Sequence, residues 1–185
     1  LIRVLTLNFN IKLFIMFKKS IQIFTLLLLV SCGKEIDKKK SIVILPEKDR
    51  AELRDQILED RFNNLLPKLM DVNDLDMWVV ISREYNEDPV IKTMLPSVWL
   101  NARRRTILVF FRDKEKNTIE KLAVARYDVG KSIKSAWNKE KEPNQWKALS
   151  RIIEERNPKK IGVNVSKNFG LADGLVKTDH DEFWK

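Results

Sequence analysis

The chain has 185 residues, 44% of them hydrophobic and 33% charged, which is enough for one ordinary domain with appendages but too little for two large domains. The formal net charge is +9, but eight of the 35 lysines and arginines lie within the first 40 residues. No groove-reading motif accompanies them, so the charge does not indicate a nucleic-acid partner. The sole cysteine, Cys32, excludes an intramolecular disulfide.

The beginning of the chain has the pattern of a secretory leader. Met16-Phe17-Lys18-Lys19 supplies a charged start, and the apolar run over residues 21–30 is too short to span a bilayer. Leu29-Val30-Ser31-Cys32 then resembles a bacterial lipobox, in which a diacylglycerol is attached to the cysteine sulfur before cleavage in front of the cysteine. The alternative is a chance cysteine behind a signal peptide. We expect Cys32 to be lipidated and to anchor the protein in the bacterial cell envelope, at the periplasmic face or the cell surface.

These patterns divide the first quarter of the chain into two parts. Residues 1–31 are the expected leader, with Met16 as the start and residues 1–15 untranslated or removed. Residues 32–45 are the lipidated cysteine and a charged tether, because residues 33–40 carry six charges and cannot form a core.

Residues 46–70 are expected to form an amphipathic helix with one core face. Its apolar residues recur at three- and four-residue steps: Leu53, Ile57, Leu58, Phe62, Leu65, Leu66 and Leu69. Pro67 should kink or interrupt the last turn, because proline lacks a backbone donor and clashes with the preceding turn.

A short apolar run over residues 77–81 predicts a strand that is buried on both faces and lies centrally in a sheet. The polar segment over residues 83–89 leaves the carboxyl end of this strand, where open α/β sheets place their functional loops. Residues 90–95, between Pro89 and Pro96, are expected to form a short helix.

The next elements complete the predicted fold. Residues 106–111 form a second buried strand, which a polar turn over residues 113–117 joins to residues 122–127 in a hairpin. A second amphipathic helix carries Trp146, Leu149, Ile152 and Ile153 and is bounded by Pro143-Asn144 and Asn157-Pro158. An alternating strand follows at residues 161–165.

This order of elements predicts an α/β fold, a mixed β-sheet with packed helices. Trp78 and Trp146 are assigned to the core.

The last residues contain the best candidate for a metal site, Asp179-His180-Asp181-Glu182. Consecutive residues on an opening helix point in different directions, so at most two of these side chains could share one ion. The alternative is a solvated helix start, for which Thr178 followed by Asp181 has a capping pattern. We therefore predict no metal ligand in this chain. Because the helix would have only residues 182–185 left, the chain is expected to be a fragment.

Several short segments, in order along the chain, resemble one protein family. They are Leu66-Pro67-Lys68-Leu69-Met70 with residues 76–80, residues 83–89, Ala102-Arg103-Arg104-Arg105-Thr106, and Ile161-Gly162-Val163-Asn164 with Ser166. Over residues 46–177 the chain resembles the amino-terminal domain of the creatinase, prolidase and aminopeptidase P family, and especially its bacterial lipoprotein-like Xaa-Pro peptidases.

The resemblance implies that chemistry belongs to another domain. In this family the amino-terminal domain is a mixed α/β layer, and a following pita-bread domain holds two divalent metal ions on two Asp, one His and two Glu. Residues 178–185 would then begin the connection to a missing catalytic domain, and this chain would hold no cofactor and be inactive alone. His180 is not equated with the family's metal histidine. Residues 88–94 depart from the family's Asn-x-x-Tyr-Leu-Thr-Gly-like segment, which leaves the peptide substrate open.

Six side chains are expected to border the cleft of the missing domain or a subunit contact: Arg83, Tyr85, Asp88, Trp99, Arg103 and Arg104. The alternative is a salt-bridged sheet edge. The first functional hypothesis is a non-catalytic domain of an Xaa-Pro peptidase that covers the cleft and makes subunit contacts. Its partners would be the membrane, the catalytic domain and, in a homo-oligomer, a second copy. The second hypothesis is a free-standing, non-catalytic lipoprotein that binds a protein or peptide partner.

Overall fold

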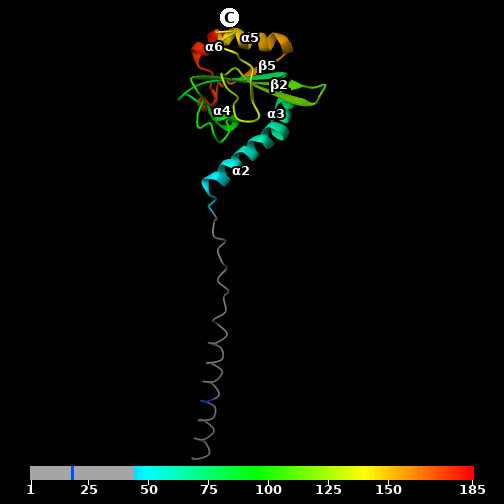
Figure 1. Ribbon diagram of the computed structural model, residues 1–185. Helices are drawn as coiled ribbons and strands as arrows, with labels where there is room; N and C mark the ends of the chain where they lie inside the picture. The colour runs from blue at the N-terminus through cyan, green and yellow to red at the C-terminus, as the bar shows by residue number, and fades with distance from the viewer. Residues whose placement is uncertain (1–17, 19–43) are drawn as a thin grey trace, which may run out of the picture. The chain divides into compact units, whose positions relative to one another are not determined.

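The computed structural model describes Lys18 and residues 44–185. The chain divides into two units, Leu1–Ile44 and Leu45–Lys185, and the second unit contains the helices and strands treated below (Figure 1). The expected leader, the start at Met16, Cys32 and most of the tether lie outside the described residues and stay predictions. Within the described part, no helix combines the length and the apolar character needed to cross a membrane.

The second unit is built on a mixed five-stranded sheet with the strand order β4-β3-β2-β1-β5. The strands are β1 (Met77–Arg83), β2 (Arg105–Asp113), β3 (Thr118–Ala123), β4 (Lys134–Ser135) and β5 (Ile161–Val163). β2 runs antiparallel to β1 and β3, whereas β5 is parallel to β1 and β4 is parallel to β3. The predicted α/β class with a mixed sheet is confirmed.

The two long strands confirm the predicted burial on both faces. Val79 and Ile81 of β1 lie in one apolar cluster, and Val80 lies in the other, as the alternation of a strand requires. The predicted position inside the sheet is confirmed for β1, which pairs with β2 on one side and with β5 on the other, although β2 is the middle strand of the five. The hairpin is confirmed, but β3 begins at Thr118, before the predicted residues 122–127.

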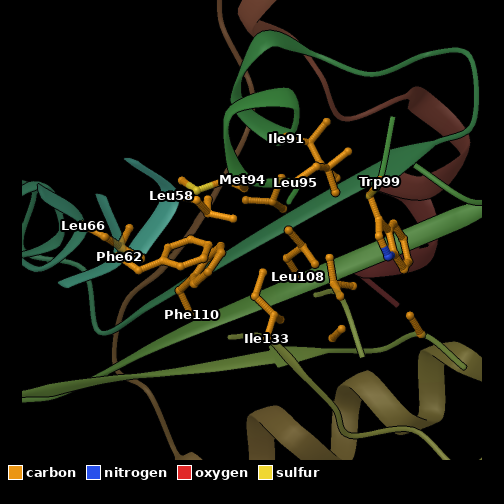
Figure 2. Close-up of a cluster of buried hydrophobic side chains, with 14 of the residues drawn as sticks. Leu58, Phe62, Leu66, Ile91, Met94, Leu95, Trp99, Leu108, Phe110 and Ile133 are labelled. Atoms are coloured by element: carbon orange, nitrogen blue, oxygen red, sulfur yellow. The ribbon is translucent and has the colours of Figure 1, made fainter. Parts of the chain in front are cut away.

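One face of the sheet is covered by α2 (Glu47–Asp60), a π-helical turn η1 (Arg61–Leu65), α3 (Leu66–Val72) and α4 (Pro89–Met94). Figure 2 shows Phe62 lying against Phe110 of β2, and their ring centroids are 5.6 Å apart. Asp88 begins α4 by accepting a hydrogen bond from the backbone N–H of Ile91 at 2.8 Å. The predicted short helix at residues 90–95 is therefore confirmed within a residue of its bounds.

The first amphipathic segment has a narrower core face than its sequence predicts. The buried side chains are spaced every four residues: Leu58, Phe62, Leu66 and Met70. Leu53, Ile57, Leu65 and Leu69 are exposed. A sheet buries only one face of a helix that packs on it. The apolar residues of this segment occupy more than one face, so some of them stay exposed. Pro67 lies in the first turn of α3 directly after the π-helical turn, and Asp60, Leu65 and Leu66 keep a right-handed helical backbone. The hydrogen-bond pattern therefore changes before the proline, but the helix is not interrupted there.

The other face of the sheet is covered by α5 (Gln145–Arg156) and by Leu175 with α6 (Lys177–Phe183) (Figure 1). A 3-10 turn, η2 (Gly170–Ala172), precedes α6 and contacts α4. The Oδ1 atom of Asn144 accepts from the N–H groups of Trp146 and Lys147, which begins α5. Asn157 ends it in the left-handed conformation with φ 45°. Both predicted bounds of this helix are confirmed.

The two tryptophans assigned to the core are only partly buried. Trp78 packs against Phe110 and donates its indole N–H to Oδ1 of Asn164 at 2.8 Å. Trp146 packs partly against the core and partly lines a surface pocket. An indole places an apolar ring and a polar N–H in one side chain, so a position at the edge of the core satisfies both.

Candidate functional site

A pocket of about 730 Å³ opens where β1 ends and β2 begins. Arg83 is the last residue of β1 and lies opposite Arg105, the first residue of β2, in the antiparallel register. The chain after β3 and the loop that leads into α5 supply the remaining walls. Four segments distant in sequence therefore meet at one end of the sheet.

The walls of this pocket, called the cationic pocket below, combine positive charge with aromatic rings. Its cations are Arg83, Arg103, Arg104, Arg105, Arg126 and Lys139. Its aromatic side chains are Trp99, Tyr127, Trp137 and Trp146. Within the part of the chain that the structure describes, no aspartate or glutamate lines the pocket. Such walls favour an anionic group that also has an apolar or planar part.

Backbone contacts fix the three consecutive arginines at the pocket. Arg104 has a φ of 51°, which turns the chain sharply before β2. Its N–H donates to a carboxylate oxygen of Glu84 at 3.0 Å, and its carbonyl accepts from the N–H of Glu84 at 2.7 Å. The N–H of Arg103 donates to the hydroxyl of Thr106 at 3.0 Å. The turn is thus held against the end of β1.

Two of the guanidinium groups lie over indole rings. Arg103 is 4.9 Å from the ring centroid of Trp99, and Arg105 is 4.9 Å from that of Trp146. A guanidinium that stacks on a ring keeps its in-plane N–H groups available to an oxyanion. The tryptophans therefore orient these arginines.

Asp179 of α6 joins two arginines of the pocket. Its carboxylate is only 1% exposed, accepts a hydrogen bond from Nε of Arg83 at 2.8 Å, and forms an ion pair with a terminal nitrogen of Arg105 at 3.0 Å. Burial by itself raises the pKa of Asp179, but the hydrogen bond from Arg83 and the charges of Arg105 and Arg83 outweigh it and hold that pKa below its ordinary value. The hydrogen bond to Asp179 correspondingly raises the pKa of Arg83.

The predicted solvated helix start is wrong for Asp179, since β1 and β2 supply arginines that the sequence does not place beside it. The predicted capping pair is wrong too, because α6 follows Val176 without a side-chain cap. Thr178 instead accepts a hydrogen bond from Arg83, and Asp181 pairs with Lys177.

The segment from Asp179 to Glu182 does not fit a metal ion. Asp179 is held by two arginines, and the neighbouring Asp181 forms an exposed pair with Lys177. Among the described residues there is no group of three or more His, Cys, Asp or Glu side chains that could hold a metal. No metal-dependent step is assigned to this segment.

Four of the six predicted site residues line the cationic pocket: Arg83, Trp99, Arg103 and Arg104. Tyr85 lies in a turn with φ 67° and is 86% exposed, outside the pocket walls. Asp88 is 6% exposed and accepts from the amide of Asn164 at 2.6 Å as well as from α4, so its role is structural.

The sequence reasoning missed Arg105, Arg126, Tyr127, Trp137, Lys139 and Trp146 of the pocket walls. One signal was present for Arg126 and Tyr127. The predicted hairpin brings the end of its second strand to the start of its first, which lies beside Arg105. No comparable signal existed for Trp137 and Lys139, which lie in a loop.

Comparisons of the chain with family models, with curated proteins and with solved structures found no match.

Proposed function

We propose that this chain is the non-catalytic amino-terminal domain of a lipid-anchored Xaa-Pro peptidase-like metallopeptidase of the bacterial cell envelope. In this proposal it has the mixed α/β fold of the creatinase, prolidase and aminopeptidase P amino-terminal domains. It covers the cleft of a following catalytic domain and makes subunit contacts. The two metal ions and the hydrolytic chemistry belong to that catalytic domain.

One observation carries this proposal. Two segments that carry the family resemblance, residues 83–89 and residues 102–106, contribute Arg83 and the arginines 103–105 to a single pocket. The side chains of Arg103 and Arg104 form no ion pair within the described residues, so their charge is available to a further group. A working surface at the carboxyl end of β1 agrees with the placement of functional loops in α/β sheets.

Exposed apolar side chains near the pocket favour contact with another protein surface. Val98 and Leu100 flank the buried Trp99 and are exposed, and Tyr127 is exposed at the pocket wall. Apolar side chains gathered beside a charged pocket are typical of interaction sites rather than of a fully solvated surface.

The genomic sequence after the codon of Lys185 tests the family assignment. We expect the reading frame to continue into a domain with two aspartates, one histidine and two glutamates as metal ligands. An in-frame stop codon directly after Lys185 would contradict this proposal.

The second candidate function is a free-standing lipoprotein that binds a protein or peptide partner. It is favoured by the cationic pocket, which residues 83–146 of this chain form. A stop codon after Lys185, together with a pocket that binds ligand, would support this candidate instead.

A further inference from the structure

The cationic pocket has a large excess of positive charge. Six cations line it, and Asp179 is the single carboxylate paired with any of them in the described part of the chain. Arg103, Arg104, Arg126 and Lys139 have no ion-pair partner there. Like charges held this close repel one another, and an anion in the pocket would remove that repulsion.

The charge is presented by rigid groups. Five of the six cations are arginines, whose planar forks bind carboxylate and phosphate through two N–H groups at once. Stacking on Trp99 and Trp146 orients Arg103 and Arg105, and Asp179 orients Arg83 and Arg105. Arg105 also has a buried Nε atom for which the described chain supplies no hydrogen-bond acceptor.

The pocket also has room and apolar walls for more than an ion. Its volume of about 730 Å³ lies within the usual range for sites that take small organic molecules. Trp137 and Tyr127 also line the pocket. Within the described part of the chain, no cation stacks on either of these two rings. The first turn of α5 faces the same space, and the positive end of its helix dipole adds to the field on an anion.

We infer that the cationic pocket binds a small organic anion with several negative oxygens, carboxylate or phosphate, attached to a planar ring. The oxygens pair with Arg103, Arg104 and Arg126, and the ring packs on the side chains of Tyr127 and Trp137. The pocket is formed by this chain alone, so the two proposals are tested independently. A chain that binds no anion could still belong to the proposed family, and a chain outside that family could still bind the anion.

Calorimetric titration of the full chain, purified in detergent, tests the inference with two pairs of probes. Tripolyphosphate is compared with adenosine triphosphate, and citrate with benzene-1,3,5-tricarboxylate. In each pair the charged groups are alike and only the second member has a planar ring. We expect the second member to bind at least tenfold more tightly in at least one pair, and the pair with the tighter binding identifies the source as phosphate or carboxylate.

Variants assign the binding to the pocket. Arg126→Gln and Arg103→Gln remove one exposed cation each and should weaken binding of the tighter probe at least tenfold, with an unchanged melting temperature. Lys159→Gln is the matched control, because Lys159 is exposed and its N–H contacts Asp76, at the opposite end of β1 from Arg83. It should leave the affinity unchanged.

Three results would overturn the inference: no binding of any probe up to about 1 mM, equal affinities within both pairs, or an equal loss of affinity in Lys159→Gln. The first would refute the anion site, the second would refute the role of the aromatic walls, and the third would show that the binding follows net charge alone.

Discussion

Asp179 joins α6 to the end of β1 and the start of β2 through ion pairs with Arg83 and Arg105. Its buried carboxylate is bound by Arg83, whose side chain is 42% exposed, and by Arg105, whose side chain is 29% exposed. The charge of the carboxylate is stabilised mainly by these arginines, because water does not reach it. The guanidinium groups are also stabilised by water. Loss of this charge should loosen the end of the chain and also release two cations of the pocket.

Asp179→Asn should lower the free energy of unfolding by about 1 to 3 kcal/mol at pH 7, since hydrogen bonds to charged groups are lost in a buried place. Because the folded-state pKa of Asp179 lies below its ordinary value of 3.8, its contribution is complete above that pH and is lost as the pH falls through the folded pKa. Urea titrations of both proteins across this range should show their difference shrinking only in acid.

Asp181→Asn is the control for this substitution, because Asp181 lies on the same helix and its pair with Lys177 is exposed. Its urea midpoint should match that of the wild type. Equal midpoints for the two variants would contradict the role given to Asp179.

Gly174 tests the packing around Asp88. A Cβ atom at Gly174 would lie 2.1 Å from a carboxylate oxygen of Asp88 and 2.7 Å from its Cβ atom. Asp88 cannot move away without losing its hydrogen bonds to Ile91 and Asn164. Gly174→Ala should therefore destabilise the protein by about 1 to 3 kcal/mol.

Gly170→Ala is the matched control, since a Cβ atom there would meet nothing within 4 Å. Thermal unfolding of both variants measures the difference. A melting temperature for Gly174→Ala that equals that of Gly170→Ala would show that Asp88 is free to move.

At the scale of elements, the strands and helices with strong apolar patterns were predictable. The runs that became β1 and β2 and the capping residues of α5 carry their signals in adjacent residues. β4 has only two residues, too few for any pattern. The burial pattern of β1 indicated a place inside the sheet, but sequence order alone did not show that β2 is the middle strand.

The candidate site was less predictable than the elements. The polar segment after β1 indicated the correct end of the sheet, and four of the six predicted side chains line the pocket. The pairing of Arg83 with Asp179 joins residues 96 positions apart, and only the packing of α6 on the sheet brings them together. Local patterns therefore predicted the location of the site but not its charge balance.

Trp78 tests the contact between β1 and the segment after β5. Truncation to Ala removes its packing on Phe110 and its hydrogen bond to Asn164. We expect a loss of about 3 kcal/mol, the low end for large aromatic side chains, because Trp78 is only partly buried. Trp78→Phe keeps most of the ring contact and should lose only about 1 kcal/mol.

Urea midpoints of these two variants can be compared with that of Trp184→Ala, in which the exposed Trp184 is removed. If Trp78→Ala were no less stable than Trp184→Ala, the packing described for β1 would be wrong.

At the scale of the whole molecule, the proposal requires a lipid anchor at Cys32. In a bacterium fed labelled fatty acid, the wild type should incorporate the label, and Cys32→Ala should remain an unlabelled precursor of higher mass. Membrane attachment alone is a weaker criterion, because an uncleaved apolar leader would also retain the chain. Equal labelling of the two proteins would refute the anchor.

We propose, as the central claim, that this chain is a non-catalytic domain of a metallopeptidase and that another domain carries the metal ions. Hydrolysis of Xaa-Pro peptides, measured with added manganese, cobalt or zinc, tests it most directly. The chain from Cys32 to Lys185 should show no turnover alone, because its single histidine lies beside acids that are paired with lysine or arginine. Adding the catalytic domain that we propose to follow Lys185 should give metal-dependent cleavage. Metal-dependent cleavage by the chain alone, abolished in His180→Ala, would contradict the claim.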